Sequence, residues 1–172
     1  MARRDKAGGT PATVALARAG VEFDLHPYEH EAGTGHHAYG TEAVAALGLD
    51  PAQVFKTLVA RVDGRLVVAV VPVSGSLDLK ALAAAVGGKR AEMAEAPDAE
   101  RATGFVVGGI SPVGHRSRLD VVVDATATGQ ERVYVSAGRR GLQMSLSPDD
   151  LVAVTGARVA PVARVAQPGR PG

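Results

Sequence analysis

Apolar and polar residues follow one another along this chain in patterns that predict short strands mixed with helices. The clearest pattern is a pair of runs rich in β-branched residues, at 55–62 and 65–73, separated by Asp63 and Gly64. A two-residue Asp-Gly connection between such runs is typical of a tight hairpin. Other short apolar or alternating runs predict further strands at residues 22–26, 105–107, 120–125, 131–136, 141–145 and 157–162.

Helix starts are marked by residues that commonly cap helix N-termini. Thr10 stands before a proline and opens a helix that ends near residue 19, while Asp78 and Ser147 precede two further helices. Residues 41–47, and a short segment that ends at 100–103, complete the predicted helices. Strict alternation of strand and helix is absent, so we expect an α+β architecture around a mixed or largely antiparallel sheet.

The length and composition fit one globular domain. The 172 residues are 46% hydrophobic and 22% charged, which is ordinary for a chain that buries a core. Polar or Gly- and Pro-rich ends predict a disordered leader at 1–9 and a disordered tail at 165–172, around a folded domain at 10–164. No apolar run has the length of a membrane span or of a signal-peptide core, so we expect a soluble, cytoplasmic protein without a membrane partner.

The overall charge is balanced, but its distribution along the chain is uneven. The 19 Lys and Arg residues nearly cancel the 18 Asp and Glu residues, which gives a formal net charge of +1. Residues 21–55 contain acids and no Lys or Arg, whereas residues 101–172 are rich in arginine. The balance excludes a uniformly basic nucleic-acid binder, and the segregation leaves room for a local basic surface that holds phosphates.

Several kinds of chemistry are disfavoured because their residues are missing or wrongly spaced. Without cysteine the chain has no disulfide, zinc-thiolate site, iron–sulfur cluster or cysteine nucleophile of its own. A proline lies between His26 and His30, and His36 and His37 are adjacent, so neither pair is placed like two metal ligands on one helix face. P-loop, serine-elbow and zinc-protease motifs are also absent. We therefore expect no metal site.

Two features remain as candidates for a functional site. Lys56 lies within the apolar stretch 54–59, where its ammonium either points to solvent or sits in a cleft that binds an anion or polarises a carbonyl. Gly108 and Gly109 begin a run to Gly114 that forms either an ordinary turn or a nest of backbone amides for an anion. Basic turns with Arg116, Arg118, Arg139 and Arg140 add to a possible phosphate-binding surface.

Taken in order, several segments resemble the YbaK/EbsC family, the prolyl-tRNA-editing-like Cys-tRNA(Pro) deacylases. They are residues 23–30 (FDLHPYEH), 54–58 (VFKTL), 70–73 (VVPV), 77–80 (LDLK), 107–112 (VGGISP) and 134–142 (YVSAGRRGL). The resemblance covers residues 10–164. It implies a single α+β domain in which a twisted, barrel-like mixed sheet is surrounded by helices.

The resemblance also implies an activity. Family members release cysteine from mischarged Cys-tRNA(Pro) beside prolyl-tRNA synthetase and use no metal or cofactor. The substrate's own thiol would attack its ester carbonyl, with water or a ribose hydroxyl as alternative nucleophiles. Deacylation of Ala-tRNA(Pro), and a non-catalytic module that binds tRNA or the synthetase, are the alternatives. Lys56, the complete G-G-I-S-P run and Ser136 favour the enzyme.

The family pattern also predicts which residues form the site. Lys56 matches the family's essential lysine and is the expected catalytic residue, anchoring the terminal nucleotide while amides of residues 108–111 contact the carbonyl. The expected substrate-binding residues are Tyr28, Tyr39, Thr57, Gly108, Gly109, Ile110, Ser111, Pro112 and Ser136. Two features depart from the pattern. The loop with His36 and His37 is longer than usual, and Gln143 stands where an acid is expected, so the choice between Cys and Ala stays open.

Overall fold

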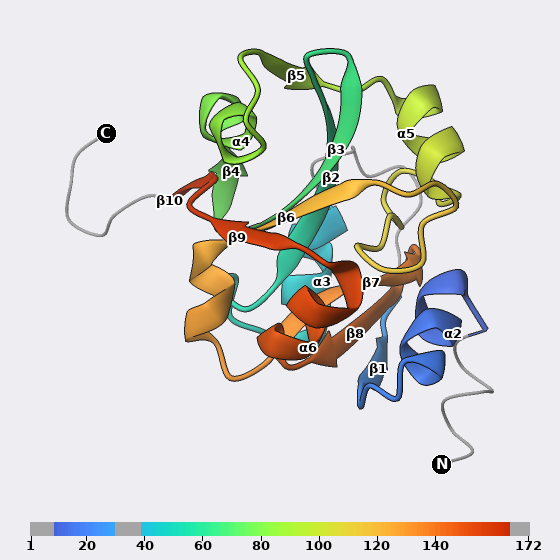
Figure 1. The fold of residues 1–172 in the computed structure, drawn as a ribbon. Coiled ribbons are helices and arrows are strands. Elements are labelled where there is room, and N and C mark those ends of the chain that lie inside the picture. Colours follow the sequence, from blue (N-terminus) through green and yellow to red (C-terminus); the bar gives the residue numbers. More distant parts are fainter. Residues whose placement is uncertain (1–8, 30–38, 166–172) are drawn as a thin grey trace.

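Short strands and helices follow one another along the chain in the computed structural model, which describes residues 9–29 and 39–165 (Figure 1). The strands are β1 (Asp24–Pro27), β2 (Phe55–Val62), β3 (Arg65–Pro72), β4 (Gly75–Leu77), β5 (Ala91–Met93), β6 (Asp120–Asp124), β7 (Val133–Arg139), β8 (Leu142–Leu146), β9 (Arg158–Ala160) and β10 (Ala163–Val165). The helices are α2 (Pro11–Arg18), α3 (Tyr39–Leu47), α4 (Leu79–Ala85), α5 (Ala96–Thr103), α6 (Pro148–Thr155) and the 3₁₀ helix η2 (Ala125–Gly129). None of these described helices is long and apolar enough to cross a bilayer.

The largest sheet is built on the predicted hairpin. Strands β2 and β3 pair antiparallel from Phe55 opposite Pro72 to Val62 opposite Arg65. Asp63 and Gly64 both have positive φ, 47° and 90°, as a tight turn between two twisted strands requires. The sheet order is β5-β2-β3-β6-β9, with β3, β6 and β9 running parallel, so the expected mixed sheet is confirmed.

A second, three-stranded sheet has the antiparallel order β1-β8-β7. One parallel bridge between Val54 and Tyr134 joins it to the edge of β2, where the Tyr134 amide donates to the Gln53 carbonyl at 2.9 Å. The strands therefore curve around a shared interior. Among the described residues they do not close into a barrel, which corrects the barrel-like expectation: only this bridge connects the two sheets.

Two hydrophobic cores cover opposite faces of the large sheet. The first lies inside the curve, where Phe55 and Val59 of β2 meet Val135 and Met144 of the second sheet, with Leu16 of α2. The other lies under α4, and includes Ala60, Val62, Val71 and Leu82. Strand β3 is buried on both faces for this reason, which explains why its sequence is a continuous apolar run.

The predicted helix caps are confirmed. The side chains of Thr10, Asp78 and Ser147 accept hydrogen bonds from amides three residues ahead, at 3.2, 3.0 and 3.1 Å. The predicted strand at 105–107 is wrong, because this segment is a loop. Its amides are satisfied by side chains instead of by a neighbouring strand: that of Val107 donates to a Glu100 carboxylate oxygen at 2.8 Å. The predicted leader and tail lie almost wholly outside the described residues and stay predictions.

Candidate active site

Lys56 lies near the start of β2, where its side chain is half-buried. Its position opposite Val71, which is fully buried, places the lysine stem on the face of the sheet turned away from the first core. Within the described residues its ammonium has no hydrogen-bond or ion-pair partner. Burial lowers the pKa of Lys56 from its ordinary value of 10.5, because the charged form loses water without gaining a counter-charge. A half-buried ammonium without a partner in the described part of the chain fits a lysine that binds an anion better than a lysine that points freely to solvent.

The bridge between β2 and β7 brings a second predicted residue to Lys56. Lys56 and Ser136 each lie two residues beyond the bridged pair Val54 and Tyr134, on parallel segments, so their side chains lie on the same face. Ser136 pairs in turn with Gln143 of β8. We call this surface, formed by His26, Lys56, Tyr134, Ser136, Gln143 and Ser145, the polar face.

Two side chains of the polar face differ in how their polar atoms are satisfied. Ser136 is 9% exposed, and its hydroxyl accepts a hydrogen bond from the Gly138 amide at 3.1 Å, which fixes the turn after it. Gln143 is 7% exposed, and its carbonyl oxygen Oε1 is buried without a hydrogen-bond partner among the described residues. Buried polar groups in proteins nearly always have a partner, so this oxygen needs an explanation.

Tyr28 lies at the rim of the polar face. Its amide donates to the Gly141 carbonyl at 2.9 Å, which holds it beside the turn between β7 and β8. Burial raises the pKa of the Tyr28 phenol, and hydrogen bonds with the Gly141 backbone and the Gln143 side chain act in the opposite direction. Glu42 of α3 is close enough to raise it further, so α3 reaches over this rim. Tyr39 begins α3, but its side chain lies outside the described residues, so its role stays a prediction.

The far end of the polar face holds a histidine that the sequence did not single out as part of the site. His26 Nε2 lies 2.8 Å from the Ser145 hydroxyl, and its ring lies 5.1 Å from that of Tyr134. Arg132 donates to the Ser145 carbonyl at 2.8 Å and pairs with Asp24 at 3.1 Å. Burial, more than its charged neighbours, lowers the pKa of His26 from its ordinary value. The alternation of polar residues along β1 and β8 was the sequence signal that could have placed His26 on this face.

The glycine-rich loop is fixed against the turn between β7 and β8. A Cβ on Gly109 would lie 2.8 Å from the Arg139 Cα and 2.9 Å from the Arg140 nitrogen, so only glycine allows this approach. The Arg140 Nε donates to the Val107 carbonyl at 2.9 Å, which ties the loop to the same turn. The Gly141 carbonyl of this turn also binds the Tyr28 amide, so the turn anchors both the loop and the rim of the polar face.

Not every amide of this loop is available for a ligand. The Gly109 amide donates to the Val106 carbonyl at 2.8 Å. The amides of Gly108, which has φ 92°, Ile110 and Ser111 have no acceptor among the described residues. The Ser111 side chain is fully buried and accepts from the Val113 amide at 3.2 Å, and Pro112 is buried beside it. Contact between this loop and a substrate stays a prediction, for which the amides of Gly108, Ile110 and Ser111 are the available donors.

Thr57 does not share a face with Lys56. Successive side chains of a strand point to opposite sides, so Thr57 lies on the face of Phe55 and Val59, which belong to the first core. Its hydroxyl is buried and has no hydrogen-bond partner in the described part of the chain. The structure therefore separates its side chain from the polar face, and its expected part in substrate binding stays a prediction.

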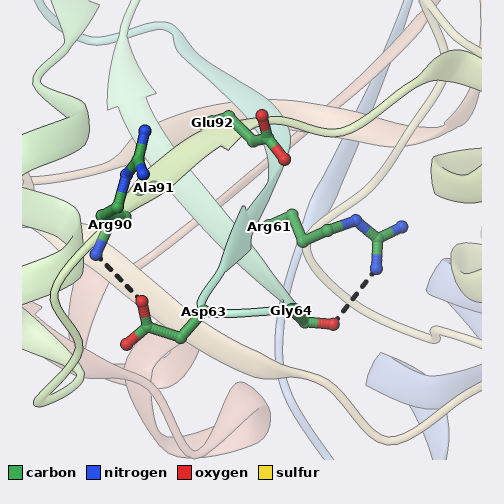
Figure 2. A pocket seen from close by; sticks show the side chains of 6 residues that line it. All are labelled: Arg61, Asp63, Gly64, Arg90, Ala91 and Glu92. Carbon is green, nitrogen blue, oxygen red and sulfur yellow. Dashed lines mark hydrogen bonds between the residues drawn. The ribbon is translucent and has the colours of Figure 1, made fainter.

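A cavity of about 350 Å³ lies at the other end of β2 (Figure 2). It is lined by Arg61, Asp63, Gly64, Arg90, Ala91 and Glu92. Its polar groups largely bind one another: Arg61 donates to the Gly64 carbonyl at 3.2 Å, and the Asp63 carboxylate accepts from the Arg90 amide at 3.0 Å. Arg61 lies five residues beyond Lys56, about 17 Å along the strand. The cavity is therefore separate from the polar face.

No group of three or more His, Asp or Glu side chains in the described residues is arranged to hold a metal ion. His26 is engaged by Ser145, and His115 Nε2 lies 2.7 Å from the Ser111 carbonyl oxygen. His36 and His37 lie outside the described residues. The expectation that the protein uses no metal stays a prediction.

Comparison of this chain with known proteins shows the family to which it belongs. The family model of the aminoacyl-tRNA editing domain matches residues 36–154. A protein of Enterococcus faecalis named as a candidate Cys-tRNA(Pro)/Cys-tRNA(Cys) deacylase, EbsC, is 37% identical over 146 residues, which are 83% of this chain and 88% of that protein. A proline–tRNA ligase of a Geobacter species is 33% identical over 119 residues, 69% of this chain and 21% of the ligase.

A solved structure agrees with these relatives. It is described as a candidate trans-editing enzyme for prolyl-tRNA synthetase, and it superimposes with a TM-score of 0.79 at 27% identity, covering 90% of this chain and 95% of its own. The matched residues include Lys56, the glycine-rich loop, Ser136 and Gln143. The resemblance read from the sequence motifs is confirmed: this chain belongs to the aminoacyl-tRNA editing domain family.

Proposed function

We propose that this protein is a trans-editing deacylase that releases cysteine from mischarged Cys-tRNA(Pro). The observation that carries the proposal is the half-buried Lys56 ammonium, which has no partner among the described residues and lies on the polar face. Such a cation suits an anionic or strongly polarised group of a ligand. The name of the Enterococcus faecalis relative supports an ester of cysteine and tRNA as that ligand.

The chemistry needs no nucleophile from the protein. The deprotonated thiol of the substrate cysteine attacks the carbonyl carbon of its own ester, and a carbon–sulfur bond forms. The bond between the carbonyl carbon and the ribose oxygen then breaks, the ribose oxygen takes up a proton, and a thiolactone leaves. Hydrolysis of the thiolactone by water gives free cysteine. The absence of cysteine from the chain is compatible with this route, because the thiol arrives on the substrate.

The protein contributes position and charge. Lys56 anchors the terminal nucleotide of the tRNA beside the ester, so that the cysteine is held on the polar face. The amides of Gly108, Ile110 and Ser111 have no acceptor among the described residues and remain as donors for the negative charge on the carbonyl oxygen, since the Gly109 amide is already used. Donors fixed before the reaction stabilise such a charge without reorganising during the step.

The rest of the tRNA requires a surface for phosphates. Arg116 and Arg118 are exposed and follow the glycine-rich loop, and their guanidinium groups have no hydrogen-bond or ion-pair partner in the described part of the chain. Arg116 packs on Gly104 at the base of that loop. These arginines can hold the acceptor stem. The weak overall charge of +1 is in keeping with modest affinity for tRNA alone, and we propose prolyl-tRNA synthetase as the partner that supplies selectivity, in the cytoplasm where it charges tRNA.

Deacylation of Cys-tRNA(Pro), Ala-tRNA(Pro) and Pro-tRNA(Pro) by the purified chain tests the proposal. We expect release of cysteine well above the spontaneous rate, with proline retained. Release of alanine in preference to cysteine would assign the alternative substrate. Tight binding of all three without release would make the protein a binding module and refute the proposal.

A further inference from the structure

Gln143 holds the most unusual polar atom on the polar face. Its Oε1 is buried and has no hydrogen-bond partner among the described residues. The other half of the amide is accounted for, because the side chain hydrogen-bonds with the Tyr28 hydroxyl. The Gln143 backbone lies in the middle strand of the sheet, between Ser136 and His26, so the residue is held firmly in place.

An unsatisfied buried acceptor destabilises a protein, and native structures keep few of them. One that persists at a ligand site is most simply explained by a donor on the ligand. Gln143 is 7% exposed while Oε1 itself is buried, so a donor for this oxygen has to come from a ligand seated against the polar face.

The ligand's own chemistry narrows the choice of donor. On the proposed function, on which this inference rests, the ligand is an aminoacyl ester. Its carbonyl and phosphate oxygens are acceptors, which match the Lys56 ammonium and the free loop amides. Its α-ammonium is a strong cationic donor, and none of those groups can bind it. The Gln143 oxygen and the Lys56 ammonium, which both lack a partner among the described residues, therefore complement opposite ends of the same ligand.

We infer that Gln143 Oε1 accepts a hydrogen bond from the α-ammonium of the aminoacyl group and so orients the amino acid on the polar face. Gln143 is thus a positioning residue. Because a side-chain amide is neutral, it selects for a donor without placing a buried negative charge in the empty site. The contact distinguishes an amino acid from an acyl group that lacks nitrogen, whatever the side chain of that amino acid is.

A substrate without the amino group tests this contact. The 3-mercaptopropionyl ester of tRNA(Pro) keeps the thiol and the ester of the cysteinyl substrate and lacks only the α-ammonium. Deacylation of both esters is measured at limiting substrate, each rate being divided by its spontaneous rate. We expect the parent chain to prefer the cysteinyl ester by about tenfold to a hundredfold, as for a hydrogen bond to a charged group.

Substitution of Gln143 completes the comparison. Gln143→Leu should remove the preference by slowing only the cysteinyl ester, with the mercaptopropionyl rate unchanged. Its Tm should stay close to that of the parent, since the gain from removing an unsatisfied acceptor offsets the loss of the hydrogen bond with Tyr28. Gln143→Glu, which strengthens the acceptor, should keep or increase the preference. Gln130→Leu, the same change outside the polar face, should retain the parental preference.

Other results would overturn the inference. Equal slowing of both esters by Gln143→Leu would mean that Oε1 meets another donor, such as a ribose hydroxyl. A preference that survives Gln143→Leu would place the ammonium contact elsewhere. If the parent accelerated neither ester, the proposed function itself would be wrong and the inference with it.

Discussion

Lys56→Met is the substitution that examines the site most sharply, because its effects on activity and on stability should have opposite signs. The variant keeps the apolar stem beside Val71 and removes the ammonium, which has no partner in the described part of the chain. A hydrogen bond between an ammonium and a polarised ligand group contributes about 1.5–3 kcal/mol. Loss of that contact in the transition state corresponds to a rate reduction of roughly tenfold to 150-fold.

The stability of the same variant should not fall. Burial lowers the pKa of Lys56, so the folded chain is disfavoured relative to one without this charge. That penalty is fully present below the folded-state pKa and disappears as pH rises to the unfolded value of 10.5. At neutral pH we therefore expect Lys56→Met to melt at or above the parental Tm, and the difference to shrink in alkaline buffer.

Single-turnover deacylation of Cys-tRNA(Pro), together with thermal melting of the same preparations, measures both effects. Lys80→Met is the matched control, since Lys80 is exposed on α4 and should tolerate the change with parental activity and Tm. Parental activity in Lys56→Met would refute the role of the ammonium. Lost activity with a Tm lowered by many degrees would show that the lysine serves the fold instead.

Two further predictions concern the loop and the tRNA. Gly109→Ala places a Cβ 2.8 Å from the backbone of the turn between β7 and β8, and should lower both Tm and deacylation, whereas Gly129→Ala, which meets no atom within 4 Å, should change neither. If Arg116 contacts a phosphate as proposed, Arg116→Gln should reduce the slope of log KM against log salt by about 0.7–0.9, while Arg90→Gln at the distant cavity should leave it unchanged. Steady-state deacylation between low and moderate salt measures the second prediction, and identical slopes in all three proteins would contradict it.

Local sequence signals predicted much of this fold because they act over a few residues. Asp63 and Gly64 predicted the turn between β2 and β3, and Thr10 predicted the start of α2. Both predictions succeed because the geometry of a turn or a helix cap depends only on the adjacent backbone. The strand prediction for 105–107 was wrong because apolar residues there fit a strand pattern. In the structure the amides of Phe105 and Val107 donate instead to the side chains of Thr103 and Glu100 of helix α5. The bridge from Val54 to Tyr134, which joins the two sheets, has no local signal.

The sequence predicted individual residues of the candidate site, but not how distant strands bring them together. Lys56 and Ser136 stand out in their motifs, but only the pairing of β2 with β7 places them on one face. The alternation of residues along β2 puts the Thr57 side chain on the other side, which the motif conceals. His26 was read as one of several histidines with poor metal spacing, and its contact with Ser145 arises from the pairing of β1 with β8.

The fate of a cysteinyl ester whose thiol is blocked tests the central claim most directly. The purified chain is incubated with Cys-tRNA(Pro) and with S-methylcysteinyl-tRNA(Pro), and the rate of ester loss is compared with the spontaneous rate of each. The account predicts rapid loss of the cysteinyl ester and near-spontaneous loss of the S-methyl ester, because only the former carries its own nucleophile. Equal acceleration of both esters, or acceleration of neither, would contradict it.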